Sequence, residues 1–200
     1  MNDPAGATPP PSTQAGGGMM RLTIKTPPTV LAVDPALVRD HLRIEIGPED
    51  YLVENYIRAA TALLDGWTGI LGRALMPQTW VMTLASFPAG CITIPLGPVA
   101  SIVAVRYRDA TGTWQTVAPG DYEASLGDVS AELRAPAGWP GAGDWLDAVE
   151  VEFVAGDGCP DAVRVAIMFM VAAIFDGRQG DDMLTPAAKS LTAPHRVRRV

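Results

Sequence analysis

The feature that most limits how this chain folds is residues 159–178, CPDAVRVAIMFMVAAIFDGR. Between Arg164 and Asp176 this stretch has no charged and no ordinary polar side chain. Pro160 indicates the start of a helix and Gly177 its end. A helix that is apolar on every side is a buried helix, and crossing a bilayer takes about 20 apolar residues, more than the uncharged portion offers. We therefore predict a short helix that protein covers on both sides.

The two sides of this helix need different partners. One side carries Val163, Ile167, Met170 and Ile174 at helical spacing. We expect this side to pack on an earlier amphipathic helix within GPEDYLVENYIRAATALLDGWTG. The opposite side must be covered by a β block or by a neighbouring subunit. It holds the candidate subunit-interface residues Val165, Met168, Phe169 and Ala172.

Between these helices the periodicity changes from helical to alternating. Before both of them we predict a shorter helix that ends at about Leu42. Asp34 is its N-cap and Pro35 its first helical residue. After Pro77, six or so short runs of alternating apolar side chains, separated by Gly and Pro, indicate antiparallel strands. The predicted fold is α+β: a small bundle of N-terminal helices and one C-terminal helix, with an inserted antiparallel β module and an extended C-terminal tail.

These patterns divide the chain into four parts. Residues 1–20 are of low complexity and are expected to be disordered, and Met19 and Met20 offer alternative starts, so this segment need not be translated. Residues 21–76 and 159–178 form the predicted helical core, and residues 77–158 form the inserted β module. Residues 179–200 form a linker and a basic arm.

Charge is distributed unevenly along the chain. Fifteen Lys and Arg residues against 22 Asp and Glu residues give a net charge of −7, which argues against a protein that grips nucleic acid through its overall field. The C-terminal segment KSLTAPHRVRRV, in contrast, contains Lys and Arg and no acid. An acidic body with a basic tail indicates a partner for the tail.

The sequence contains no motif for catalysis or cofactor binding. It lacks the G-x-S-x-G, Walker A, dinucleotide-binding and H-E-x-x-H signatures. Its cysteines and histidines do not have the spacing of a metal site, and Glu150 and Glu152 alternate with apolar residues as on any half-exposed strand. We predict that the protein is not an enzyme and has no cofactor and no metal.

Two alternatives remain open. Tryptophans that are exposed and coplanar would form a carbohydrate-binding platform, and the protein would then be a ligand-binding β module of a tail component. The tryptophans of the β block are Trp80, Trp114, Trp139 and Trp145. The remoter alternative is a small hydrolase whose site is assembled from scattered acids.

Seven pieces of the sequence follow one another in an order typical of a known family. They are DHLRIE, EDYLVENYIRAATALLDGWTG, PQTWVMTLASFP, ITIPLGPVASIVAVRYRDATG, GWP, VEVEFVAG and PDAVRVAIMFMVAAIFDGR. In this order they resemble the head–tail connector (portal adaptor, or head-completion) proteins of long-tailed phages, prophages and gene transfer agents. The resemblance covers roughly residues 34–200, and a gene transfer agent adaptor is the preferred case.

The resemblance implies a structural protein of the virion or gene transfer agent neck, made in the bacterial cytoplasm. Members of this family form a ring, usually of twelve copies, under the portal. The ring extends the DNA channel and offers the attachment surface for the next neck or tail component. The expected partners are the portal protein, a downstream stopper or tail-terminator protein, and further copies of this chain. DNA would pass through without specific binding, and no membrane is involved.

We expect the basic arm to dock on the portal and to become ordered only there. Leu191 and Val197 would supply apolar anchors, and the arginines would supply charge pairs. The candidate portal-binding residues are Leu191, His195, Arg196, Val197, Arg198, Arg199 and Val200.

Overall fold

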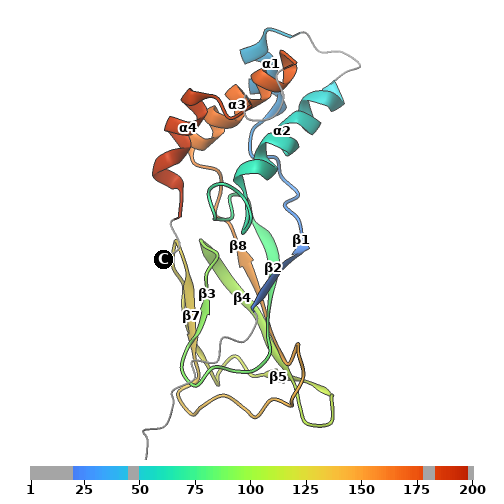
Figure 1. The fold of residues 1–200 in the computed structure, drawn as a ribbon, viewed down its shortest axis with the longest axis vertical. Helices are drawn as coiled ribbons and strands as arrows, with labels where there is room; N and C mark the ends of the chain where they lie inside the picture. The colour runs from blue at the N-terminus through green and yellow to red at the C-terminus, as the bar shows by residue number, and fades with distance from the viewer. Residues whose placement is uncertain (1–19, 45–49, 178–182, 198–200) are drawn as a thin grey trace, which may run out of the picture.

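The computed structural model describes residues 20–44, 50–177 and 183–197. Helices gather at one end of an elongated molecule and strands at the other (Figure 1). The helical part consists of α1 (Pro35–Leu42), α2 (Asp50–Leu64), α3 (Asp161–Phe175), α4 (Pro186–Thr192) and the 3₁₀ turn η2 (Ala193–His195). The predicted α+β fold is confirmed, and the segment 1–19 with its expected disorder lies outside the described residues.

Two antiparallel sheets form the β sandwich. The larger sheet has the strand order β1-β2-β8-β4-β5, and the smaller one has the order β3-β7-β6. The strands are β1 (Arg21–Thr26), β2 (Gln78–Leu84), β3 (Ile92–Ile94), β4 (Val99–Arg108), β5 (Trp114–Val117), β6 (Glu123–Ser125), β7 (Ala131–Arg134) and β8 (Val149–Ala155). β2 and β8 pair from Gln78 opposite Ala155 to Leu84 opposite Val149. The chain therefore enters and leaves the main body of the sandwich on neighbouring strands.

The core of the sandwich lies between the two sheets. Met82 and Phe153 of the larger sheet and Ile94 and Leu133 of the smaller sheet are fully buried in one apolar cluster. Their neighbours in sequence point to the outer face of each sheet, as a side-chain period of two requires. The alternation that predicted these strands is also the pattern that builds this core.

A second apolar cluster fills the helical part. Val163, Ile167 and Met170 of α3 are fully buried in it together with Ile57 of α2. Ile174 is partly buried and packs against the same cluster. The predicted packing of this side of α3 on α2 is confirmed.

Two elements were not predicted from the sequence. β1 pairs with β2, with Arg21 opposite Thr83, and forms the edge of the larger sheet. Its side chains are mostly exposed, so it lacks the apolar signal of a buried strand. α4 begins after Thr185, whose hydroxyl accepts a hydrogen bond from the Ala188 N–H at 3.2 Å, and Ala188 is fully buried in the helical cluster. Part of the arm that we expected to order only on binding is therefore folded on its own subunit.

Asp65 ties the helical part to the sandwich at the end of α2. Its Oδ1 accepts a hydrogen bond from the Leu75 N–H at 2.7 Å, and its Oδ2 accepts one from Nε2 of Gln78 at 2.8 Å. Burial raises the pKa of this carboxyl, and the two hydrogen bonds oppose that rise. At the same junction Gly156 has a φ of 99°, and a Cβ added there would lie 2.2 Å from the Met76 carbonyl oxygen. Polar contacts and close backbone packing therefore fix the crossing from helices to strands.

Candidate interaction surfaces

The outward side of α3 is apolar and open. Val165 is 40% exposed, and Met168, Phe169 and Ala172 are each partly exposed. Phe175, at the end of the same helix, is 49% exposed. Val165, Phe169 and Ala172 therefore lie on the side of α3 that faces away from the buried cluster, whereas the partly exposed Met168 also packs against that cluster. Whether they contact another subunit stays a proposal.

α1 extends this apolar surface. The His41 ring lies against the Phe169 ring with centroids 5.8 Å apart. Leu37 lies one helical turn before His41 and is 51% exposed. The main contacts of α3 are with α2, α4 and α1 rather than with the strands. Of the two covers that we expected, the β block is not the one seen: α1 covers part of this side through His41, and a neighbouring subunit stays a proposal. Leu37 and Phe175 are surface residues that sequence reasoning missed.

The C-terminal segment runs along the helical part as far as the structure describes it. Leu191 packs against the helical cluster, and the Val197 N–H donates a hydrogen bond to the Leu71 carbonyl at 2.8 Å. Arg196 is exposed, whereas His195 and Val197 are half-buried. The remaining predicted arm residues, Arg198, Arg199 and Val200, lie outside the described residues.

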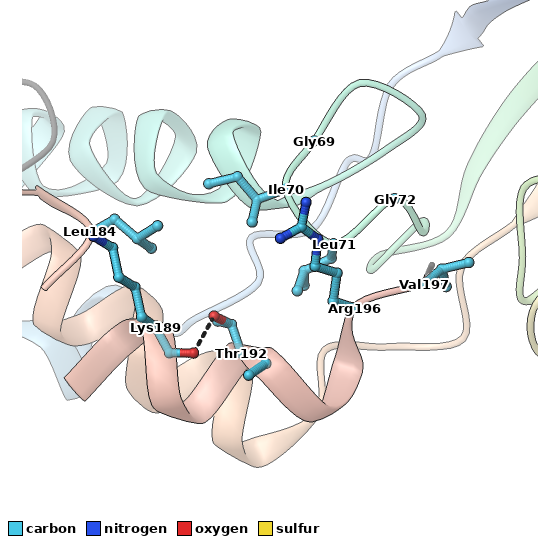
Figure 2. Close-up of a pocket in the computed structure, with 10 residues that line it drawn as sticks. Gly69, Ile70, Leu71, Gly72, Leu184, Lys189, Thr192, Arg196 and Val197 are labelled. Atoms are coloured by element: carbon cyan, nitrogen blue, oxygen red, sulfur yellow. Dashed lines mark hydrogen bonds between the residues drawn. The ribbon is translucent and has the colours of Figure 1, made fainter. Parts of the chain in front are cut away.

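An open pocket of about 890 Å³ lies between this segment and the loop that follows α2. Ile70 and Leu71 line it on the loop side, and Lys189 and Arg196 line it on the C-terminal side (Figure 2). An apolar wall opposite two cations suits a protein segment that carries both apolar and acidic side chains. One sequence signal could have indicated this pocket. Thr185 followed by Pro186 is typical of a helix start, and that helix, α4, carries the pocket residue Lys189.

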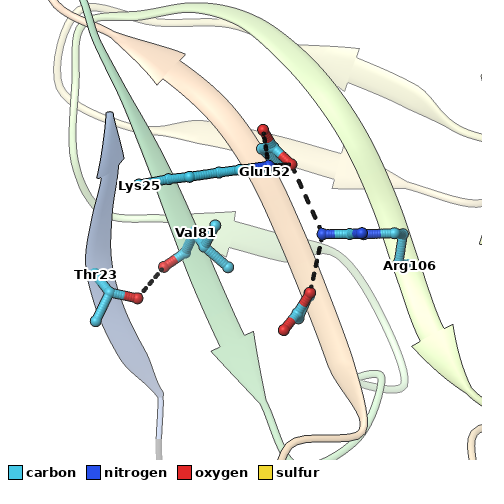
Figure 3. Close-up of polar contacts among 6 residues, drawn as sticks. Thr23, Lys25, Val81, Arg106 and Glu152 are labelled. Carbon is cyan, nitrogen blue, oxygen red and sulfur yellow. Dashed lines mark hydrogen bonds and ion pairs between the residues drawn. The ribbon is translucent and has the colours of Figure 1, made fainter. Parts of the chain in front are cut away.

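The outer face of the larger sheet carries paired charges. Nζ of Lys25 donates to both carboxylate oxygens of Glu152 at 2.7 Å. Arg106 approaches Glu152 at 3.7 Å and Glu150 at 3.1 Å, and Figure 3 shows Lys25 and Arg106 reaching Glu152 from opposite sides. Glu152 is only 9% exposed. The alternation in the sequence indicated that Glu150 and Glu152 are solvated, but in the structure both are ion-paired. Their carboxylates are already satisfied by protein cations.

The tryptophans of the sandwich do not form one open platform. Trp80 is 5% exposed, and Trp139 stacks on Phe87 with the ring planes 4° apart. Trp114 and Trp145 are 37% and 41% exposed, and both have the Arg108 guanidinium over their rings. A sugar would have to compete with that guanidinium for the ring faces.

The titratable groups point to packing rather than to chemistry. Burial raises the pKa of the Cys159 thiol to about 12, which keeps it protonated and unreactive at neutral pH. Among residues 20–44, 50–177 and 183–197, no three His, Cys, Asp or Glu side chains group as a metal site requires. In the same ranges, no helix has both the length and the apolar character that spanning a membrane demands.

Comparison with known proteins gives matches among solved structures. No protein-family model and no curated protein matches the chain. A chain in "Neck of empty GTA particle computed with C6 symmetry" is 25% identical with a TM-score of 0.74, covering 90% of this chain and 97% of that one. A chain in "Virion of native gene transfer agent (GTA) particle" is 25% identical with a TM-score of 0.73, covering 90% and 96%. A chain in "Neck of native GTA particle computed with C12 symmetry" is 25% identical with a TM-score of 0.70, covering 91% and 97%.

The similarity extends over nearly the whole of each chain, helical part and sandwich together. The matching chains are structural components of gene transfer agent particles and not enzymes. The resemblance seen in the sequence is confirmed at this level. The protein is a structural protein of the virion neck, of the gene transfer agent type, and it is not an enzyme.

Proposed function

We propose that this chain is the head–tail adaptor of its particle. In this role, copies of the chain form a ring under the portal, extend the DNA channel, and offer the surface on which a stopper or tail-terminator protein assembles. The observation that carries the proposal is the open apolar side of α3, in a chain that aligns with a neck protein over 97% of that protein's length. A neck that was treated with C12 symmetry supports a ring of twelve.

We assign the ring contact to the outward sides of α1 and α3 in the helical part. Val165, Met168, Phe169 and Ala172 of α3 form the centre of the contact, and Leu37 of α1 extends it. An apolar surface of this kind is favourable only when another surface excludes water from it. A neighbouring copy in a ring supplies such a cover at every position.

We assign the portal contact to the end of the arm. Leu191 is already packed on its own subunit, so it holds the arm in place rather than reaching outward. The exposed Arg196 and the residues after it, Val197, Arg198, Arg199 and Val200, then supply the cations and apolar groups for an acidic portal surface. The net charge of −7 is compatible with a conduit that does not hold DNA phosphates.

The ring contact is tested with Val165→Asp and Phe169→Asp in particles that lack the wild-type gene. We expect each variant to fold, because its side chain is not in the buried cluster, and to be incorporated at least about tenfold less. The matched control is Val129→Asp, since Val129 is an apolar side chain of the sandwich that is 53% exposed. Folded variants that enter particles as efficiently as the control would contradict the ring contact.

The portal contact is tested by removing residues 196–200. Truncation from residue 189 would delete part of α4 and its buried Thr192, so the shorter deletion separates docking from folding. We expect a small loss of thermal stability, because the hydrogen bond from the Val197 N–H to the Leu71 carbonyl is removed, and a much larger fall in incorporation into portal-bearing particles. Undiminished incorporation would reject the assignment of the arm to the portal.

A further inference from the structure

Arg108 differs from the other cations on the outer face of the larger sheet. Arg21 pairs with Asp147 at 3.1 Å, Lys25 pairs with Glu152, and Arg106 pairs with Glu150. Arg108 forms no ion pair with any described residue. Its Nε, like that of Arg106, is buried without a hydrogen-bond partner among them. The charge at this end of the face is therefore not neutralised by the part of the chain that the structure describes.

Two tryptophans hold the Arg108 side chain. Trp114 of β5 lies directly opposite Arg108 in the antiparallel pair, and the guanidinium carbon is 4.8 Å from its ring centroid. The same carbon is 6.0 Å from the Trp145 ring centroid. Both distances are within the range of cation–π attraction. Flanking rings restrict the rotamers of a long side chain and so lower the entropy that Arg108 loses on binding.

Trp145 is itself fixed by the hairpin between β4 and β5. Its Nε1 donates to the Asp109 carbonyl at 3.1 Å, and the Gly143 N–H donates to the Arg108 carbonyl at 2.8 Å. Its ring rests on Gly112, where a Cβ would lie 3.1 Å from the indole. The next residue, Leu146, is 88% exposed. A positioned cation, two partly open indoles and a free leucine therefore stand together at the surface.

The outer face of the smaller sheet has the opposite character. Its strands carry exposed Glu123 and Glu132 against a single cation, Arg134. Glu132 lies on β7, the central strand, between Thr93 and Ser125, and it forms no ion pair with a described residue. Because the two sheets pack face to face, the acidic face and the Arg108 face lie on opposite sides of the sandwich.

We propose that Arg108, held between Trp114 and Trp145, receives the carboxylates of Glu123 and Glu132 from the smaller sheet of a neighbouring copy. Opposite faces that complement one another give a head-to-tail contact, which closes into a ring when the rotation between copies allows it. Leu146 supplies an apolar contact beside the charge pair. The inference rests on the proposed ring function and adds a second contact, on the sandwich, to the one on α3.

Charge exchange tests the contact in particles and on the purified full chain. Arg108→Glu is expected to lower both incorporation and the self-association constant from sedimentation at low salt by at least about tenfold, because like charges then face one another. Glu123→Lys with Glu132→Lys should have the same effect. Combining all three changes should restore association to within about threefold of wild type. Arg58→Glu is the matched control, since it makes the same charge change on an exposed arginine of α2.

Gly112→Ala probes the positioning without changing a charge. The added methyl would meet the Trp145 ring at 3.1 Å, and the φ of 84° at Gly112 makes any side chain there strain the turn as well. We expect weaker self-association with Arg108 still present and a changed tryptophan emission spectrum, and thermal unfolding of the same variant measures the contribution of the strain.

The outcomes separate this inference from the proposed function. If wild type is incorporated and Arg108→Glu is incorporated equally well, the sandwich contact is wrong and the adaptor function stands. If wild type is not incorporated, the adaptor function is wrong, and self-association of the purified chain alone decides the contact. The inference is overturned if the purified chain does not self-associate, or if Arg108→Glu associates as strongly as wild type. If the triple exchange does not restore association, Arg108 binds a different acidic partner and the inference is wrong. If the chain binds a DNA oligonucleotide and Arg108→Glu abolishes this binding, the partner of Arg108 is a phosphate group.

Discussion

The outward side of α3 and the outer face of the larger sheet lie on the same chain but differ in chemistry. α3 exposes Val165 and Phe175, 40% and 49% respectively, whereas the sheet exposes charges that already have partners, as Arg21 has in Asp147. Covering apolar surface with any surface that excludes water lowers the free energy. Paired surface charges gain little from a new partner. The helical part is therefore the region that a second protein surface would stabilise most. On the sandwich, the proposed second contact would use Arg108 of the larger sheet and Glu132 of the smaller sheet, two charges that form no ion pair with a described residue.

The sharpest measurement of this difference uses one substitution in both regions. Phe153→Ala in the sandwich core should lower the free energy of unfolding by about 3–5 kcal/mol, because the residue is fully buried and leaves a cavity. Phe169→Ala on α3 should cost about 1 kcal/mol, because part of its ring is already in water. Urea unfolding of the two variants measures both values. Equal losses would mean that the outward side of α3 is as closed as the sandwich core.

The junction between the regions should respond next most strongly. Asp65→Ala removes the acceptor for the Leu75 N–H and the Gln78 amide, and leaving such groups unpaired costs about 2 kcal/mol. We expect one cooperative transition at a lower urea midpoint, because both parts share this contact. Two separate transitions in the wild type would contradict the coupling of the helical part to the sandwich.

Asp65→Asn tests the same contact through pH. Burial raises the pKa of Asp65 in the folded chain above its ordinary value of 3.8, so folding favours the protonated form. The stability that the Asp65 carboxyl contributes is fully present below pH 3.8 and is lost as the pH rises through the raised pKa. The unfolding free energy of Asp65→Asn should therefore increase relative to wild type between pH 4 and neutrality, in parallel denaturation series. A difference that is independent of pH would reject the raised pKa.

The smallest effect is expected at the exposed hairpin of the sandwich. Hydrogen bonds from the Thr111 hydroxyl and then from Gln115 lower the pKa of Asp109 to about 2. A depressed pKa stabilises the folded state above the unfolded value of 3.8, and this stability is lost as pH falls through about 2. The stability advantage of wild type over Asp109→Asn should accordingly shrink between pH 4 and pH 2. A constant difference would mean that Asp109 does not order the turn as an anion.

Local patterns were sufficient for most of the fold. Asp34 caps α1 as predicted, with its carboxylate accepting from the Ala36 N–H at 2.8 Å. β8 was predictable because Val151 and Phe153 must face a core while Glu150 and Glu152 must not. Helical period alone placed Val165 and Phe169 on the side of α3 away from α2. These features depend on neighbours within a few residues.

Contacts between distant segments were not predictable in the same way. The side chains of β1 are mostly exposed, and β1 is a strand because its backbone pairs antiparallel with β2. α4 carried its own signal in Thr185 and Pro186, but the polar segment before it favoured a linker. Arg108 meets Trp145 only because the loop before β8 folds back on the hairpin, and no spacing in the sequence indicates that return.

The position of β1 in the chain limits how such a protein can change by recombination. β1 precedes α1 and α2 in sequence, yet it completes the sheet whose other strands all follow those helices. A chimera that exchanges only residues 78–155 between two relatives would pair a new β2 with an old β1, whereas one that also exchanges residues 21–26 would keep the native edge. Exchange of the whole sandwich without α1 and α2 therefore requires one crossover on each side of these helices and another after β8, so β1 and the later strands must be inherited together although two helices separate them in the sequence.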